Sequence, residues 1–262
     1  MPSSTPSWTS SPAVSLRRNW HDHHDHREFV VESADDVTED IREPLLRPAD
    51  GGPLPEFRPG RHITCAEADA PGTTRAYSLT GAARSDALGA YRLAVRRIDG
   101  GVFSPVVHRG LTAGARRLVT VPSGLFAIPV DHDQPVVLLA AGVGITPFLG
   151  HLETPASTGG SVPEVVPHHG NRNRRTHPFA DRLRKLDEAI ARLTVIDHYS
   201  RPDAEDVIGV HYSAFGRVTA EHIDEELIRR RARFYIRGPQ AMIDAVTAGL
   251  TASRRPEVRH LR

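Results

Sequence analysis

The sequence predicts two domains, an antiparallel β-barrel followed by an α/β domain built on a parallel sheet. The chain of 262 residues is long for one globular domain and sufficient for two, each with its own core. Short segments of β character, separated by glycine and proline, fill residues 27–130. Over residues 131–262, buried apolar runs alternate with longer amphipathic stretches, which is the pattern of strands joined by helices.

Residues 1–26 are predicted to form a disordered leader. They begin with a stretch rich in serine and proline that lacks the continuous apolar core of a secretory signal. Histidine and aspartate then fill positions 21–26, but no helix or strand gives these metal-capable side chains a fixed geometry. We therefore expect a solvated tail and no metal site.

The barrel prediction rests on five short segments, which are EFVVES, HITCAE, RAYSLT, YRLAVRRI and RLVTVPS. Turn sequences such as DGGPLP, RPG and GAAR separate them. The second segment contains Cys65, the only cysteine, so an internal disulfide and a cluster held by four thiolates of this chain are excluded. We expect Cys65 to be a small buried apolar residue.

The α/β prediction rests on apolar runs that alternate with amphipathic ones. In order along the chain they are PVVLLAA, VPEVV, FADRLRKLDEAIARL, TVIDHYS, AEHIDEELIRRRA, RFYIRG and PQAMIDAVTAGL. The boundary between the two patterns lies near Asp131.

Charge and hydropathy narrow the class of partner. Lysine and arginine number 33 against 32 acidic residues, so no net field steers the chain onto nucleic acid or an anionic membrane. The longest apolar stretch, residues 135–150, is broken by glycine and proline and falls short of the roughly 20 residues that span a bilayer. One basic run lacks interleaved aromatic residues and is expected to be a charged helix face; it comprises Arg172, Arg174, Arg175, Arg182, Arg184 and Lys185. We expect a cytoplasmic protein that binds neither nucleic acid nor membrane.

Two barrel motifs carry side chains suited to a phosphorylated heterocycle. In RAYS, the guanidinium of Arg75 suits a phosphate, the ring of Tyr77 a flat heterocycle, and the hydroxyl of Ser78 a ring nitrogen. Further on, GVFS precedes a short predicted helix whose first amides and Ser104 hydroxyl suit a pyrophosphate. Any strand can carry such residues by chance, so each motif is weak alone.

The run LLAAGVGITPFLG is either a phosphate-binding turn after a buried strand or a loop that ends a core segment. It has two glycines of a dinucleotide fingerprint and lacks the third. RGP-QAM follows near the end of the chain. Taken singly, the glycines read equally as turn residues, Tyr77 and Phe126 as core aromatics, and Met242 as helix packing.

The ordered set RAYS, GVFS, PSGLF, AGVGITP and RGP-QAM resembles the ferredoxin-NADP reductase superfamily, with the oxygenase reductases and the reductase half of flavohaemoglobins most similar. The resemblance runs from about Glu28 to Leu250 and implies a flavin barrel followed by a nucleotide-binding domain. It implies FAD rather than FMN, with Tyr77 against the isoalloxazine and Ser78 near its N5 atom. The implied flavin-binding residues are Arg75, Ala76, Tyr77, Ser78, Gly101, Val102 and Ser104.

The same resemblance implies that NADPH or NADH binds to the second domain, with Thr146 closest to the nicotinamide. Tyr77, Ser78 and Thr146 are then the catalytic candidates. Ser200 and Arg201 follow a predicted strand and resemble the 2′-phosphate site of relatives that use NADPH, with Arg172 and Arg174 nearby. The implied coenzyme-binding residues are Gly142, Gly144, Ile145, Thr146, Ser200, Arg201, Gly238, Pro239 and Met242.

Three positions depart from the family pattern. Arg237 replaces the usual cysteine before Gly-Pro and brings a bulky cation close to the nicotinamide pocket. Arg61 replaces the glutamine of Pro-Gly-Gln. The chain ends at ASRRPEVRHLR, where relatives continue through a last strand to an acidic and aromatic end, so we expect that end to be missing.

The resemblance implies an FAD-dependent oxidoreductase that takes a hydride from NAD(P)H and passes single electrons to a separate acceptor. The acceptor is expected to be an oxygenase, a ferredoxin, a haem or globin-like protein, or a small molecule. The alternative is a degenerate flavin-binding protein without efficient NAD(P)H turnover.

Overall fold

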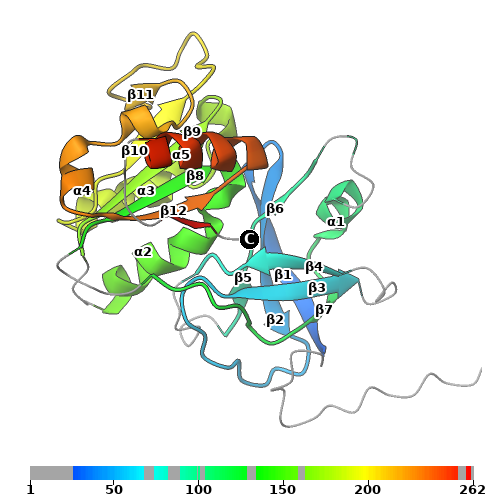
Figure 1. The fold of residues 1–262 in the computed structure, drawn as a ribbon. Helices are drawn as coiled ribbons and strands as arrows, with labels where there is room; N and C mark the ends of the chain where they lie inside the picture. The colour runs from blue at the N-terminus through cyan, green and yellow to red at the C-terminus, as the bar shows by residue number, and fades with distance from the viewer. Residues whose placement is uncertain are drawn as a thin grey trace, which may run out of the picture.

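The fold comprises a curled antiparallel sheet of seven strands and a parallel sheet of six, which confirms the predicted fold class (Figure 1). The computed structural model describes residues 26–67, 74–81, 89–98, 100, 104–128, 134–158, 163–252 and 258–260. Residues 1–25 of the predicted leader, the boundary near Asp131, and the site candidates Gly101 and Val102 lie outside the described residues. Within the described part of the chain, no helix has both the length and the apolar character needed to traverse a membrane.

The antiparallel sheet is ordered β4-β3-β7-β1-β2-β5, and β6 also pairs with β2. The strand β2 was not predicted, because Pro44 and three charged residues obscure its β pattern, yet it forms a long hairpin with β1. The elements are β1 (Arg27–Thr38), β2 (Ile41–Pro48), β3 (His62–Glu67), β4 (Thr74–Ser78), β5 (Tyr91–Arg92), β6 (Val95–Arg96), α1 (Ser104–Gly110) and β7 (Arg116–Val119).

The barrel core is apolar and follows the period-two alternation of its strands. Phe29 and Val31 of β1 are fully buried, whereas the residues between and beyond them are less so. Cys65 lies in this core, and burial raises the pKa of its thiol to about 12. The prediction of a buried apolar cysteine is therefore confirmed.

The parallel sheet is ordered β11-β10-β9-β8-β12-β13 and carries helices on its two faces (Figure 1). Its elements are β8 (Val136–Ala141), η2 (Gly142–Ile145), α2 (Thr146–Thr158), β9 (Val165–Asn171), η3 (Arg174–Thr176), α3 (Ala180–Ala189), β10 (Ile196–Tyr199), β11 (Ala214–Phe215), η4 (Ala220–His222), α4 (Glu225–Arg229), β12 (Arg233–Arg237), α5 (Gln240–Ala252) and β13 (Val258–His260).

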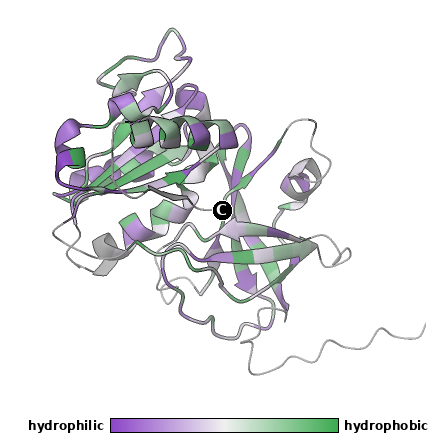
Figure 2. Ribbon diagram, viewed as in Figure 1, coloured by the Kyte–Doolittle hydropathy of each residue, from purple (hydrophilic) through white to green (hydrophobic). Residues whose placement is uncertain are grey.

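Strand β8 shows why this sequence forms a central strand. It is hydrophobic along its length (Figure 2). Leu138 and Ala140 join the core on one face of the sheet, while Val137 and Leu139 join the core on the other. A strand buried on both faces reads as a continuous apolar run, which is how the sequence identified it.

Two elements correct the sequence analysis. Val258–His260 form the strand β13, which pairs in parallel with β12, so a last strand follows α5 where the sequence suggested none. The pattern Val-Arg-His was too short and polar to be recognised, and pairing with β12 decides its conformation. The helix α2 was also missed, because its glycine-rich start and apolar composition resemble the end of a core segment.

The two domains pack directly against each other. Ile41 and Ala94 of the barrel belong to the same core cluster as Leu138 and Phe148 of the α/β domain. In addition, α2 lies so close to the barrel that a Cβ atom on Gly150 would be 3.0 Å from the carbonyl oxygen of Gly81. The two domains therefore share one continuous apolar core at their contact.

An ion-pair network reinforces this contact. Arg182 of α3 binds Glu153 of α2 and crosses to Glu43 of β2, with a guanidinium-to-carboxylate distance of 2.9 Å to Glu43. It also donates to the carbonyl oxygen of Thr80 in the barrel. The three charged side chains are between 15% and 21% exposed. Arg182, which the sequence placed in a basic helix face, is thus an interdomain residue.

Candidate functional site

A cleft of about 480 Å³ lies between the two domains. It brings together strand β4 of the barrel, the start of α1, the turn η2 with the start of α2, and the end of β12. Seven predicted site residues line it, together with five residues that were not predicted as site residues. The lining residues are Arg75, Ala76, Tyr77, Ser78, Ala94, Arg96, Ile98, Ser104, Val143, Gly144, Thr146 and Arg237.

The barrel wall of the cleft is the edge strand β4. This strand pairs with β3 on one side and has no strand on its other side among the described residues. Arg75 and Ala76 are exposed, and Tyr77 and Ser78 are half-buried. Partial burial of Tyr77 against the barrel core raises the pKa of its phenol to about 12, so the ring is neutral. An open backbone edge with these side chains suits a flat, phosphorylated ligand.

Helix α1 begins at Ser104, as expected from the GVFS motif. Ser104 faces the cleft, but its hydroxyl accepts a hydrogen bond of 2.9 Å from the backbone N–H of Ile98. The side chain of Ile98 is 61% exposed and also lines the cleft. An exposed aliphatic side chain beside Ser104 offers an apolar surface that the sequence motifs did not indicate.

The α/β wall is made by close approach of backbone. Gly142 has a φ of 51°, a conformation that favours glycine. A Cβ atom on Gly144 would lie 2.5 Å from the carbonyl oxygen of Arg237, so only glycine lets η2 reach the end of β12. Thr146 starts α2 and is 7% exposed at the cleft. The run LLAAGVGITPFLG is therefore a strand, a tight turn and a helix.

The turn after β12 packs on the turn after β8. A Cβ atom on Gly238 would lie 2.9 Å from Met242 Sδ and 3.3 Å from the Cβ atom of Ala141. Met242 is packed against the core on this side of the sheet, which matches the helix-packing interpretation of that residue. Arg237 lines the cleft itself. The cation of Arg237 therefore lies in the same cleft as Gly144 and Thr146.

The remaining predicted coenzyme residues lie away from the cleft lining. Ile145 is fully buried in the core, so it offers a ligand only its backbone. Ser200 and Arg201 follow β10, where the Arg201 N–H donates to the carbonyl oxygen of Arg172 at 2.8 Å. Both arginines are exposed at the carboxyl edge of the sheet. Arg174 is paired with Asp206, at 3.7 Å.

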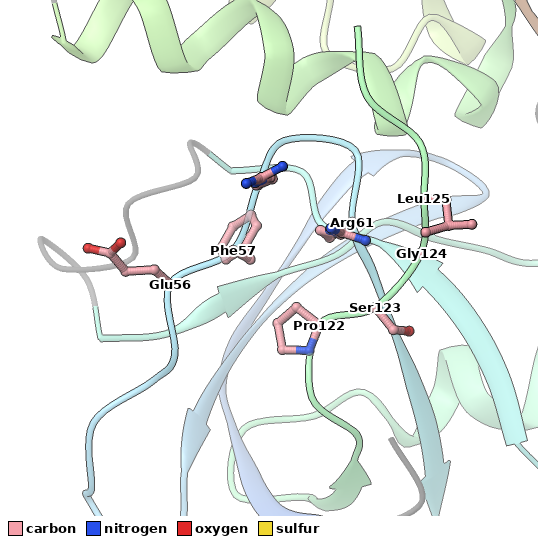
Figure 3. A pocket seen from close by; sticks show the side chains of 8 residues that line it. Glu56, Phe57, Arg61, Pro122, Ser123, Gly124 and Leu125 are labelled. Atoms are coloured by element: carbon pink, nitrogen blue, oxygen red, sulfur yellow. The ribbon is translucent and has the colours of Figure 1, made fainter. Parts of the chain in front are cut away.

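A second, separate pocket of about 390 Å³ lies on the barrel (Figure 3). It is formed where the RPGR loop meets the PSGLF segment, and its lining includes Phe57, Arg61 and Leu125. Gly124 has a φ of 108°, and a Cβ atom there would lie 2.8 Å from His62 Nδ1. Arg61, at the position of the family glutamine, therefore lines this pocket and not the interdomain cleft.

Sequence reasoning missed Ala94, Arg96, Ile98 and Val143 in the cleft. Arg96 is held by a 2.8 Å ion pair with Asp40 in the turn between β1 and β2. Val143 lies within AGVGITP but was not singled out there, whereas no motif contains the other three residues. Pairing of β6 with β2 brings Arg96 and its neighbours to the cleft. The one sequence signal for those three was the alternation of YRLAVRRI.

Comparison with known proteins identifies the two halves. Residues 138–248 match the family model of the oxidoreductase NAD-binding domain. The flavohemoprotein of Deinococcus radiodurans is 33% identical over 208 residues, which are 78% of this chain and 50% of that protein. The flavohemoprotein of Rhizobium meliloti is 31% identical over 222 residues, covering 81% and 54%. The chain thus spans about half the length of these relatives.

Solved structures agree over nearly the whole chain. The flavohem-like FAD/NAD binding domain of nitric oxide dioxygenase from Vibrio cholerae has a TM-score of 0.74 and 26% identity, covering 91% of this chain and all of that one. The cytochrome P450 reductase of Amycolatopsis has a TM-score of 0.74 and 25% identity, covering 90% and 69%. The chain therefore belongs to the ferredoxin-NADP reductase superfamily, as an FAD-dependent NAD(P)H oxidoreductase that resembles the reductase half of flavohaemoglobins.

Proposed function

We propose that the interdomain cleft holds FAD against β4 and the nicotinamide of NAD(P)H against η2, and that this reductase delivers single electrons to a redox partner. The observation that carries the proposal is that one cleft of about 480 Å³ is lined by the flavin motif of the barrel and by the glycine turn of the α/β domain. When bound, FAD supplies hydride acceptance from NAD(P)H and the return of electrons one at a time. The protein supplies binding, orientation and exclusion of water.

Different residues of β4 are proposed to bind different parts of FAD. The exposed guanidinium of Arg75 is suited to a phosphate, and the neutral ring of Tyr77 to one face of the isoalloxazine. Ser78 offers a hydroxyl near the N5 atom. Each role is assigned because the side chain suits that part of FAD chemically. The position of all three side chains in the lining of one cleft supports the assignment.

The α/β wall positions the coenzyme. Gly144 has no side chain to occupy the space between η2 and β12, and Thr146 stands at the N-terminus of a helix of 13 residues. The positive end of the helix dipole favours the coenzyme phosphates. No side chain is required as acid or base, because fixing the relative orientation of two rings removes most of the entropic cost of their reaction.

We propose NADPH as the preferred coenzyme. Arg172 and Arg201 stand on neighbouring loops at the carboxyl edge of the sheet, beside Ser200. Two exposed guanidinium groups and a hydroxyl suit a 2′-phosphate, whereas an acidic residue would suit the ribose diol of NADH.

We propose a haem protein as the first candidate acceptor, since the relatives named flavohemoproteins contain a second half that this chain does not match. An oxygenase, a ferredoxin or a small molecule remain the other acceptors, and we place the reaction in the cytoplasm. Identification of the acceptor requires reconstitution with candidate partners.

Anaerobic titration tests the proposal. Mixing the FAD-loaded protein with NADPH or NADH should bleach the flavin absorption within seconds. Persistence of the oxidised spectrum at millimolar coenzyme would favour the degenerate flavin-binding protein instead. An Arg201→Gln variant should raise the KM for NADPH and leave that for NADH unchanged; equal effects on both would contradict the coenzyme assignment.

A further inference from the structure

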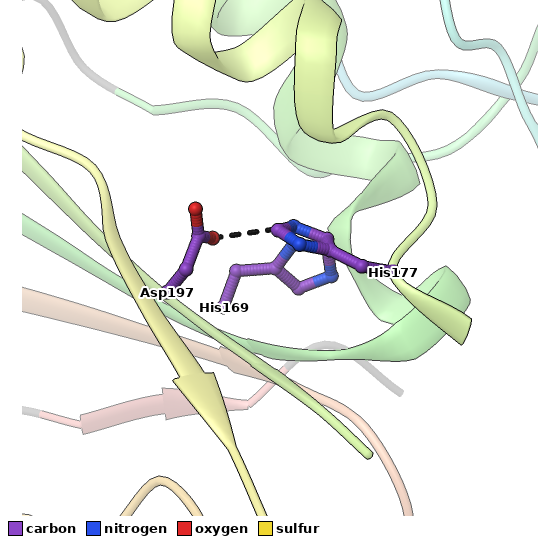
Figure 4. Close-up of side chains that lie close together, drawn as sticks. All are labelled: His169, His177 and Asp197. Carbon is purple, nitrogen blue, oxygen red and sulfur yellow. Dashed lines mark ion pairs between the residues drawn. The ribbon is translucent and has the colours of Figure 1, made fainter. Parts of the chain in front are cut away.

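Two buried histidines and a partly exposed aspartate meet behind η2, outside the cleft. They are His169 of β9, His177 after η3 and Asp197 of β10 (Figure 4). One ligand atom from each residue lies within 4.8 Å of the other two. The histidines are 0% and 4% exposed, while the carboxylate side chain is 22% exposed and so opens the group toward solvent.

The free nitrogen and oxygen atoms of this group lack hydrogen bonds. Nδ1 of His169, Nε2 of His177 and Oδ1 of Asp197 are buried and have no hydrogen-bond partner among the described residues. The ion-pair distance between His177 Nε2 and Asp197 Oδ1 is 3.2 Å, but the two atoms lack the alignment of a hydrogen bond. Burying three such atoms side by side costs free energy unless a further group binds them.

The other ring nitrogens are fixed in a way that suits metal ligation. His169 Nε2 lies 2.9 Å from the carbonyl oxygen of Gly142, which can only accept, so Nε2 carries the hydrogen and Nδ1 carries the lone pair. His177 Nδ1 lies 3.0 Å from the hydroxyl of Tyr199. An outer partner on each histidine is the arrangement that orients imidazole ligands in metalloproteins.

We infer that His169, His177 and Asp197 form a binding site for a divalent transition-metal ion, with Zn²⁺ as the first candidate. Two imidazoles and one carboxylate are a preferred donor set for zinc and leave a fourth position for water. Ligands at about 2.1 Å from one ion lie roughly 3.4 Å apart in a tetrahedron, so only small side-chain rotations are needed. Through His169 the ion would hold the carbonyl of Gly142, the first residue of the coenzyme turn.

The test must exclude adventitious Zn²⁺ binding by the histidines of residues 21–26. We would replace His21, His23, His24 and His26 by asparagine in the full FAD-loaded chain and use that protein as the reference. After treatment with a chelator, Zn²⁺ is titrated into it by calorimetry. One ion per chain is expected. Absence of binding by the reference protein overturns the inference.

Two conservative variants then address the ligands. His177→Gln and Asp197→Asn should each weaken Zn²⁺ binding by more than the roughly ten- to hundredfold cost of losing an outer-shell partner. His211→Gln, at a half-buried histidine outside the group, is the matched control and should bind Zn²⁺ as the reference does. Circular dichroism establishes that each variant is folded. Binding that stays within twofold of the reference in both folded ligand variants contradicts the site.

Discussion

The two walls of the interdomain cleft are built on different principles. The barrel wall presents side chains from an edge strand, and Arg75 and Ala76 there are exposed. The α/β wall is made of backbone in close contact, with no room for a Cβ atom at Gly144. Substitutions in the first wall should therefore alter ligand binding alone, whereas substitutions in the second should alter folding and binding together.

The largest expected effect comes from the residue that joins the walls. Arg182→Met removes the cation between Glu43 and Glu153 and leaves two largely buried carboxylates facing each other. We expect a loss of about 3–5 kcal/mol in the free energy of unfolding, because removing one member of a buried ion network leaves the remaining charges buried without a partner. Chemical denaturation measures it. Arg184→Met, on the exposed side of the same helix, should leave the stability nearly unchanged; equal losses in the two variants would refute the interdomain role.

The next effect tests the backbone wall. Gly144→Ala places a Cβ atom against the carbonyl oxygen of Arg237 and forces η2 away from β12. We expect about 3 kcal/mol of destabilisation, near the upper end for overpacking, together with a raised KM for the coenzyme. Thermal denaturation and steady-state kinetics measure the two effects. Gly81→Ala, where a Cβ atom meets no atom of the described residues within 4 Å, is the control. A stable variant with unchanged KM would show that the wall is not rigid.

His151 of α2 lies at the contact between the domains, where a Cβ atom on Gly60 of the barrel would be 2.9 Å from its Nε2 atom. This histidine should make the stability of the protein sensitive to acid. Burial lowers the pKa of this histidine from 6.5 to about 4. Below pH 6.5 the unfolded chain binds a proton there that the folded chain does not, so stability falls as the pH drops from 6.5 toward 4. His151 should contribute a loss of about 2 kcal/mol between pH 7.5 and 5. Denaturation at both pH values measures it, and His151→Leu should reduce the pH dependence by that amount; an unchanged dependence would exclude His151 as the cause.

The barrel wall should respond differently. Arg75→Gln removes a charged donor from an exposed position, so unfolding of the FAD-free protein should change by less than about 0.5 kcal/mol. The affinity for FAD should fall roughly tenfold to a hundredfold, the cost of a lost charge-assisted hydrogen bond. Fluorescence titration with FAD measures it. A loss of stability as large as that of Gly144→Ala would remove the distinction between the walls.

The smallest effect is expected at Arg237, which lines the cleft from the α/β side. Arg237→Cys restores the family residue and removes a bulky cation from the nicotinamide region. The rate of flavin reduction should rise a few-fold, as measured by anaerobic stopped-flow absorption. An unchanged or lower rate would show that Arg237 does not obstruct hydride transfer.

The sequence determined the fold class and most of the cleft. Apolar runs and turn residues predicted both sheets. A strand buried on one face alternates apolar and polar residues, and a strand buried on both faces is apolar throughout, so each kind of burial can be recognised in the sequence. The family resemblance carried by RAYS and AGVGITP implied that both motifs serve one flavin–nicotinamide site, and residues of both line one cleft. Three strands (β2, β11 and β13) and one helix (α2) were not predicted, because their formation depends on pairing or packing with distant segments.

The tertiary structure alone decided how distant residues combine. The sequence suggested that Arg182 belongs to a basic helix face, yet this side chain bridges the two domains. Its barrel partners, Glu43 and Thr80, are more than 100 residues away in the sequence and come near it only in the folded chain. His169, His177 and Asp197 are separated along the chain by up to 28 residues and show no motif, so the sequence predicted no metal site. Parallel pairing of β9 with β10 places them together. Sequence patterns record local conformation and burial, whereas contacts between strands and helices exist only after the chain has folded.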